Sequence, residues 1–273
     1  MDDFTESEFE TKKQRLVHAL SVGCIPHEHP HAYLIVGQPG AGKTTMANIF
    51  KRTEHEDAIF ISGDDYRKEH PHFKELQEQY GDDSVQHTKE FAGRMTEALI
   101  DALSQQGYHL IIEGTLRTVE VPLKTKKLLE HRGYQVSLNV MLVRPEISYL
   151  STLKRYAQMK AHGGTPRKTP KEHHDAVAKS IVENLSELYL MDAFSEIRMF
   201  TREETCIYDM QKTPRENPAH LMEAEFFRKL TSAEKQEIRD EYLPYVENAA
   251  QLDQILDDYA AIFQSPKERG QER

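Results

Sequence analysis

The chain has 273 residues, which is enough for one large α/β domain with additions or for one domain and a smaller one. Its formal net charge of −10, from 35 basic and 45 acidic residues, weighs against broad binding to nucleic acid or to an anionic membrane. Two cysteines, Cys24 and Cys206, give no disulfide framework, and neither a signal peptide nor a membrane-spanning apolar run is visible. We therefore expect a cytoplasmic protein.

The first predicted element is an amphipathic helix over residues 6–21. Its apolar positions are Phe9, Leu16, Val17 and Leu20. A segment follows at 26–31 in which histidines alternate with other residues. Alternating histidines can bind a metal, but the prolines of this segment and the lack of a second group of ligands favour a solvated linker.

Residues 37–44 read Gly-Gln-Pro-Gly-Ala-Gly-Lys-Thr and fit the phosphate-loop pattern G-x-x-x-x-G-K-[ST]. They lie between a predicted strand and a predicted helix, which is the context that this loop requires. Glycines let main-chain N–H groups point at phosphate oxygens, and the helix N-terminus adds partial positive charge. Lys43 would reach the β- and γ-phosphates, and the Thr44 hydroxyl would ligate Mg²⁺. The expected nucleotide-binding residues are Gly37, Gln38, Pro39, Gly40, Ala41, Gly42, Lys43, Thr44 and Thr45.

Strand and helix patterns then alternate along the chain. Strands are predicted near 32–36, 58–61, 109–113, 136–143, 197–200 and 205–208, and helices near 44–52, 84–106, 120–132, 146–161 and 171–190. This alternation predicts an α/β fold of the phosphate-loop NTPase class, like the nucleotide kinases, with a mostly parallel sheet and helices on both faces.

The end of the chain has a different pattern. Residues 216–263 are predicted to be helical with a break at Pro244, and 264–273 to be disordered. We therefore expect a kinase domain over 1–215, with its N-terminal helix, and a helical extension after it. The apolar positions of 252–263 follow helical spacing, and packing onto the core is favoured over binding of a partner helix.

Two carboxylates follow predicted strands: Asp64 after the second and Glu113 at the end of the third. Because ligands bind beyond the carboxyl ends of strands in open α/β sheets, both acids should converge near the γ-phosphate. One can accept the proton of an attacking hydroxyl, and the other can hold a metal-bound water or the acceptor. Asp65 lies beside Asp64, so one of the two is expected to cap the next helix instead.

Phosphoryl transfer also needs cations near the transferred group. Candidates are Arg155, on the helix 146–161, and Arg167, in a basic loop flanked by prolines that suits a lid; both could also be merely solvated. The run His173-His174-Asp175 invites comparison with a catalytic triad. Neighbours on a helix point apart and no nucleophile motif accompanies them, so we do not expect a triad.

Several motifs in matching order resemble the zeta toxins, the toxins of epsilon–zeta and PezA–PezT toxin–antitoxin pairs. They are Gly37–Thr45, Gly63-Asp64, Tyr66–Phe73, Arg94–Glu97, Ile112–Thr118, Val121-Pro122, Ser148–Tyr156 and Thr169–Asp175. The resemblance runs over roughly residues 5–210 and fades beyond about 215.

The resemblance implies ATP-dependent phosphorylation of the 3′-hydroxyl of the N-acetylglucosamine in UDP-N-acetylglucosamine, which blocks synthesis of cell-wall precursors. By motif, Lys43 and Thr44 would bind ATP and Mg²⁺, and Asp64 would be the general base. The sugar-nucleotide pocket would be formed by Glu97, Glu113, Thr115 and Arg117, and the phosphate clamp by Arg155 and Arg167. The implied partner is a small helical antitoxin whose N-terminal helix blocks the ATP site.

Two other functions remain open at this stage. The first is a phosphate-loop kinase that acts on another small metabolite or on an antibiotic. The second is a non-enzymatic nucleotide-dependent switch with the C-terminal helices as its contact surface. The strand-end acids suit any small acceptor, and only the motifs between Glu97 and Arg117 favour the sugar nucleotide.

Overall fold

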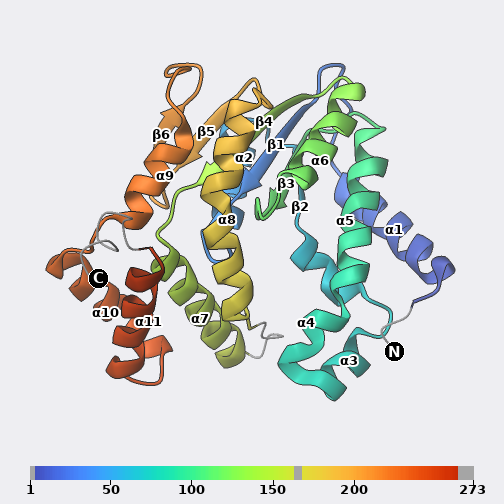
Figure 1. Ribbon diagram of the computed structural model, residues 1–273. Coiled ribbons are helices and arrows are strands. Elements are labelled where there is room, and N and C mark those ends of the chain that lie inside the picture. The colour runs from blue at the N-terminus through green and yellow to red at the C-terminus, as the bar shows by residue number, and fades with distance from the viewer. Residues whose placement is uncertain (1–3, 163–167, 264–273) are drawn as a thin grey trace.

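A computed structural model describes residues 4–162 and 168–263. Six strands of this part form one sheet in the order β2-β3-β1-β4-β5-β6 (Figure 1). Their bounds are β1 His31–Val36, β2 Ile59–Ile61, β3 Leu110–Gly114, β4 Gln135–Met141, β5 Ile197–Phe200 and β6 Cys206–Asp209. The first five strands run parallel and β6 is antiparallel to β5, which confirms the predicted mostly parallel sheet.

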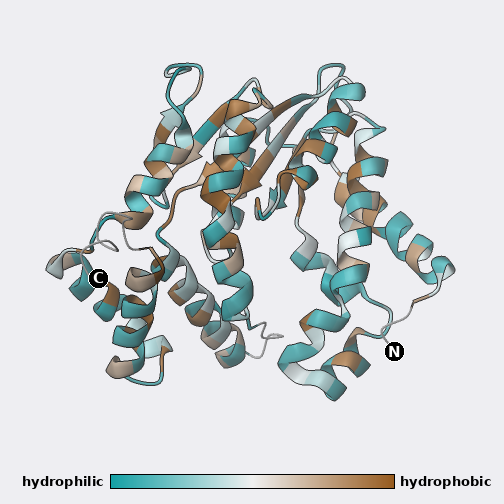
Figure 2. Ribbon diagram, in the orientation of Figure 1, coloured by the Kyte–Doolittle hydropathy of each residue, from teal (hydrophilic) through white to brown (hydrophobic). Residues whose placement is uncertain are grey.

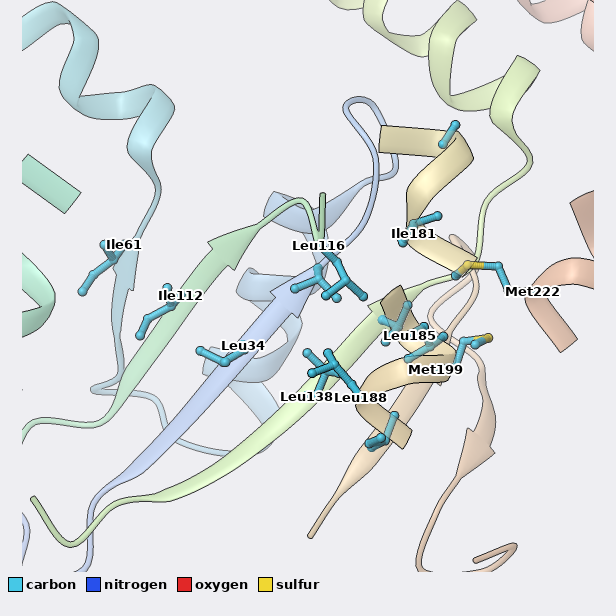
Figure 3. Packing of buried hydrophobic residues seen from close by; sticks show 14 of the residues in the cluster. Leu34, Ile61, Ile112, Leu116, Leu138, Ile181, Leu185, Leu188, Met199 and Met222 are labelled. Atoms are coloured by element: carbon cyan, nitrogen blue, oxygen red, sulfur yellow. The ribbon is translucent and has the colours of Figure 1, made fainter. Parts of the chain in front are cut away.

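Helices cover both faces of this sheet, as predicted. Their bounds are α1 Glu6–Ser21, α2 Lys43–Thr53, α5 Lys89–Ser104, α6 Glu120–His131, α7 Pro145–Ala161 and α8 Lys171–Leu190. On one face, Leu34 and Leu138 pack toward Leu185 and Leu188 of α8 (Figure 3). On the other, Tyr33 and Ile35 belong to a second apolar cluster with Met46, Ala47 and Phe50 of α2. Figure 2 shows the strands as mainly hydrophobic, with polar residues on the outer sides of the helices.

Two segments between β2 and β3 differ from the expectation. The predicted helix over 84–106 is interrupted, because α4, Ser84–His87, ends before α5 begins at Lys89. Thr88 separates them: it is buried, and its hydroxyl donates to the Ser84 carbonyl at 3.0 Å. Residues 63–83, for which no helix was predicted, form the 3₁₀ helices η1, Gly63–Glu69, and η2, Gly81–Asp83, on either side of α3, Phe73–Tyr80.

The histidine-rich segment before β1 is more ordered than the predicted solvated linker. Its His27 donates from Nε2 to Asp57 Oδ2 at 2.8 Å. The buried His109 ring stacks on the His27 ring at a centroid distance of 3.8 Å. The fold thus supplies the second ligand group that the sequence lacked, since candidate metal-ligand atoms of His27, Asp57 and His109 lie within 4.8 Å of one another. However, the His31 main-chain N–H donates to His109 Nδ1 at 2.8 Å, so the neutral His109 ring carries its proton on Nε2. The positions of His27, Asp57 and His109 are therefore explained by hydrogen bonds, without a bound metal ion.

The C-terminal part is helical, as predicted: α9 Pro218–Phe227, α10 Ser232–Tyr242, η3 Leu243–Tyr245 and α11 Ala249–Ile262. The break predicted at Pro244 coincides with η3. Buried side chains of α11, among them Leu252 and Tyr259, join the same hydrophobic cluster as the sheet, as the packing interpretation requires. The tail predicted as disordered, 264–273, lies outside the described residues. Within the described part, no helix combines the length and the apolar character needed to cross a membrane.

Candidate active site

A cleft of about 960 Å³ opens beyond the carboxyl ends of β1, β2 and β3. Its walls come from the phosphate loop, from η1, from α4 and α5, and from α7 and the start of α8. Six Lys or Arg side chains line it against three Asp or Glu side chains, in a chain whose net charge is −10. The basic residues are Lys43, Arg67, Lys89, Arg117, Arg155 and Lys168, and the acidic residues are Asp64, Glu113 and Glu172. The cleft is therefore suited to an anionic ligand.

The phosphate loop takes a shape that requires glycine at two positions. Gly40 and Gly42 have φ of +79° and +90°, in the left-handed region. A Cβ atom at Gly40 would lie 2.0 Å from the main-chain oxygen of Ser148, on α7. The loop can therefore approach α7 closely only because position 40 has no side chain.

Lys43 brings a buried positive charge to the centre of this loop. Its ammonium group donates to the carbonyl oxygens of Gly37 and Gln38 at 2.9 and 3.1 Å, and it lies 3.5 Å from Glu113 Oε1. Burial lowers the pKa of Lys43, and the negative charges of Glu113 and Asp64 oppose that shift. Thr44 and Thr45 follow at the start of α2, are exposed, and line the cleft.

The two strand-end acids both reach the cleft. Asp64, and not its neighbour Asp65, lines the cleft after β2, and its carboxylate pairs with Arg67 Nε at 3.0 Å. Glu113 lies at the end of β3, and Thr115 and Arg117 after it also line the cleft. The fold therefore brings the proposed base and most of the proposed acceptor pocket to the phosphate loop.

The remaining predicted residues have different outcomes. Arg155 extends from α7 into the cleft, where its Nη2 lies 3.5 Å from Thr169 Oγ1. Arg167 lies outside the described residues. Glu97 is one helical turn beyond Gly93, which lines the cleft, but its own carboxylate is 70 % exposed and pairs with Lys124 at 2.8 Å. The structure thus does not bring Glu97 into the cleft.

Arg67 and His173 are among the cleft residues that had no role in the sequence-based prediction. Arg67 follows Asp64 by three residues in η1, and this i,i+3 spacing could have indicated the pair. Desolvation by the walls of the cleft lowers the pKa of His173, and the positive charge of Arg117 lowers it further. The adjacent His174 points away, is fully buried, and contacts Ser148 Oγ at 2.8 Å. Asp175 Oδ1 lies 3.5 Å from His174 Nδ1, so the helix neighbours do not point apart as expected, but Ser148 is itself fully buried and its hydroxyl does not line the cleft.

Comparison with known proteins adds to this geometry. The family model described as zeta toxin matches residues 17–213. The chain is 40 % identical over 237 residues to the toxin PezT of Streptococcus pneumoniae serotype 4, a match that covers 86 % of this chain and 93 % of that protein. The chain belongs to the zeta toxin family. A zeta toxin of Streptococcus pyogenes is likewise 40 % identical over 236 residues, which cover 86 % of this chain and 82 % of that toxin.

Solved structures extend the likeness of this zeta toxin family member beyond the matched motifs. A structure of the PezAT toxin–antitoxin system of Streptococcus pneumoniae superposes with a TM-score of 0.77 at 35 % identity, covering 95 % of this chain and 98 % of that one. Because 95 % of the chain must include most residues after 213, the structural likeness also takes in the C-terminal helices. A complex of AvrRxo1-ORF1 and ORF2 with ATP, at 13 % identity and a TM-score of 0.56, shares the fold alone and covers 93 % of this chain and 86 % of that one. The phosphate loop after β1, the mostly parallel sheet and the likeness to the PezAT toxin structure together give this chain a phosphate-loop, kinase-like fold.

Proposed function

We propose that this zeta toxin family member is a kinase that transfers the γ-phosphate of ATP to the 3′-hydroxyl of the sugar in UDP-N-acetylglucosamine. The observation that carries the proposal is the meeting of Lys43, Asp64 and Glu113 in one basic cleft beside the phosphate loop. A cleft of about 960 Å³ has room for more than a nucleotide, as a two-substrate reaction requires.

In the proposed reaction, the acceptor hydroxyl oxygen forms a new bond to the γ-phosphorus. The bond from that phosphorus to the β–γ bridging oxygen breaks, and its electron pair leaves with ADP. The hydroxyl proton passes to the Asp64 carboxylate, which lines the cleft from the end of β2. Lys43, Arg155 and Arg117 supply positive charge where negative charge develops on the phosphoryl oxygens.

The residues of the loop fit a bound triphosphate with its metal. The left-handed Gly40 and Gly42 leave main-chain N–H groups free to turn toward phosphate oxygens, and the Lys43 ammonium already lies among carbonyl acceptors at the loop. The exposed Thr44 hydroxyl at the start of α2 would be a ligand of Mg²⁺. When bound, Mg²⁺ would neutralise charge on the β- and γ-phosphates.

For the acceptor we propose a pocket formed by Glu113, Thr115 and Arg117. Glu113 lies at the end of β3, Thr115 and Arg117 lie in the segment after it, and all three line the same cleft as Asp64. Their carboxylate, hydroxyl and guanidinium groups can bind sugar hydroxyls and a diphosphate. Glu97 lies outside the lining and has no part in this pocket, and Arg167, outside the described residues, stays a sequence-based candidate for the phosphate clamp.

We further propose that the protein acts as a cytoplasmic toxin and that a small helical antitoxin covers its ATP site. The PezAT structure, which is of a toxin–antitoxin system, supports an antitoxin as partner. The basic cleft would offer an acidic or polar helix of that partner a complementary surface.

The test is incubation of the purified protein with ATP, Mg²⁺ and a panel of acceptors that includes UDP-N-acetylglucosamine, read by mass spectrometry. Phosphate added to UDP-N-acetylglucosamine, and located at the 3′-oxygen by NMR, is the expected result. Phosphate added to a different acceptor instead would mean that this acceptor, and not UDP-N-acetylglucosamine, is the substrate. ATP binding without transfer to any acceptor would contradict the kinase proposal and favour a nucleotide-dependent switch.

A further inference from the structure

Arg67, in η1, contacts groups on two sides of its guanidinium. Its Nε lies 3.0 Å from Asp64 Oδ1, one turn earlier on the same 3₁₀ helix. Its Nη1 donates to the main-chain oxygen of Val85, in α4, at 2.6 Å, and lies 3.4 Å from Thr88 Oγ1. Arg67 therefore joins the strand-end carboxylate to α4, which also lines the cleft.

We propose that Arg67 is a positioning residue, which holds the Asp64 carboxylate in the orientation that accepts the proton of the acceptor. This inference rests on the proposed role of Asp64 as the base. The side chain of Asp64 is 45 % exposed, so packing alone does not fix its rotamer. The Arg67 side chain is only 22 % exposed and is itself held at Val85, so it can fix the carboxylate.

The chemistry of the guanidinium group explains why the residue is arginine. One nitrogen must contact the carboxylate while another donates to a carbonyl oxygen in a different element, and the planar guanidinium presents both in a fixed geometry. A lysine ammonium at the same place has one nitrogen and could retain the charge but not both contacts. An arginine that acted only through its charge would not need the Val85 contact.

Charge has a second effect on the same carboxylate. Among the described residues, the cationic or titratable groups that interact with Asp64 include Lys43 of the phosphate loop, Arg67 of η1 and His173 of α8, which belong to different elements. A positive charge in direct contact favours the ionised form of a carboxylate, which is the form that can act as a base. Removal of Arg67 should therefore alter both the orientation and the proton affinity of Asp64.

The experiment compares Arg67→Ala and Arg67→Lys with the native chain, with Lys68→Ala as the control. Lys68 is the exposed neighbour on η1, does not line the cleft, and carries the same charge. We expect Arg67→Ala to lower kcat by roughly 10- to 100-fold, since misplacing a catalytic group by about 1 Å can cost that much. The KM for ATP should change little, and the acid limb of the kcat profile should move up by about one pH unit.

Arg67→Lys separates orientation from charge. It should lose most of the same kcat while its acid limb stays near that of the native chain, because the positive charge remains. Lys68→Ala should match the native chain in both measurements. An Arg67→Ala variant with native kcat and a native pH profile would overturn the proposal, and so would an equal loss in Lys68→Ala.

A second measurement does not depend on the acceptor. In protein labelled with ¹³C-aspartate, the Asp64 carboxyl resonance can be assigned by its loss in Asp64→Asn and then titrated. We expect its midpoint to rise in Arg67→Ala and to stay near native in Arg67→Lys. An Asp64 midpoint that is unchanged in Arg67→Ala would refute the pairing of Arg67 with Asp64, even if the enzyme is active. A shifted midpoint in a protein that phosphorylates no acceptor would refute the proposed function but support the pairing.

Discussion

Lys43 keeps its ammonium group inside the phosphate loop, with only 6 % of the residue exposed. Replacement by alanine removes the cation of the phosphate loop and leaves the half-buried Glu113 carboxylate without the ammonium group that lies 3.5 Å from it. We expect Lys43→Ala to lower phosphate transfer by about 10²–10³-fold and to abolish growth arrest on expression. The measurements are the transfer rate and colony formation. Lys51→Ala, on the same helix, is the control, and a Lys43→Ala chain that still arrests growth would mean that the harm is not enzymatic.

Asp64 tests the proposed chemistry more narrowly. Asp64→Asn keeps the shape of the side chain but removes its capacity to take a proton, so transfer should fall by roughly 10²–10⁴-fold while ATP affinity is unchanged. Single-turnover transfer and calorimetric titration with ATP measure the two properties. Asp65→Asn, one residue along and outside the lining of the cleft, should behave as the native chain. Equal turnover in Asp64→Asn would remove this residue from the role of base.

The sequence located the residues that follow strands, whereas of the residues on helices it located Arg155 but misplaced Glu97 and missed Arg67 and His173. The phosphate loop, Asp64 and Glu113 could be predicted because a strand end fixes which edge of the sheet a residue occupies. Glu97 shares a motif with its neighbours, but its position on α5 turns it toward Lys124. Arg67 and His173 face the cleft because η1 and α8 enter it at particular angles. The i,i+3 spacing indicates that Arg67 can pair with Asp64, but not that either side chain faces the cleft.

Between elements, α11 is joined to α7 and α8 by a buried polar network. Tyr259 OH lies 2.9 Å from His174 Nδ1 and donates to Asp175 Oδ1 at 2.6 Å, while His174 Nε2 contacts Ser148 on α7. Burial and the hydrogen bond to Asp175 raise the pKa of Tyr259. Its hydroxyl therefore stays protonated at neutral pH and can donate to Asp175.

Loss of the Tyr259 hydroxyl should lower the free energy of unfolding by a measurable amount. Tyr259→Phe leaves the buried His174 and the Asp175 carboxylate each with one partner fewer, which should cost about 1–3 kcal/mol of unfolding free energy. Chemical denaturation measures it, with Tyr245→Phe on η3 as a matched control that should cost little. A Tyr259→Phe variant as stable as the native chain would show that the network adds nothing to the docking of α11.

The order of elements could be predicted, whereas their interruptions could not. Alternating apolar strands and amphipathic helices predicted every strand of the described sheet to within two residues, because burial on both faces imposes that pattern. The break at Thr88 lies inside a continuous helical pattern and arises from burial of that residue against η1 and α4. Residues 63–83 lack a periodic pattern because short helices there turn in several directions.

For the molecule as a whole, His109, whose ring stacks on those of His27 and His55 just before β3 begins, makes stability depend on pH. Burial lowers the pKa of His109 to about 4, and the neighbouring His55 and His27 contribute to the shift. In the unfolded chain this histidine titrates near 6.5, so the unfolded state binds more protons between these two values. The contribution of His109 to stability is therefore complete above about pH 6.5 and is lost as the pH falls toward 4.

A variant with no titratable ring at this position should be less sensitive to acid. His109→Asn retains an acceptor for the His31 N–H near the place of Nδ1. Between pH 7 and 5, we expect the native chain to lose roughly 1–2 kcal/mol more unfolding free energy than His109→Asn does. Thermal or chemical unfolding at the two pH values measures the difference, with His29→Asn in the exposed part of the same segment as the control. An equal loss of unfolding free energy between pH 7 and 5 in the native chain, His109→Asn and His29→Asn would contradict the role assigned to His109.

The absence of a side chain at position 40 has a consequence for how the molecule can vary. The loop backbone and the backbone of α7 meet there with no room for even a methyl group. Seven residues after Ser148, the same helix carries Arg155. Any larger residue at position 40 must displace α7, and Arg155 would move with the helix. A substitution in the phosphate loop would therefore also change the position of a cation on another side of the cleft. A change in the backbone of the phosphate loop at position 40 therefore requires a matching change in the position of α7.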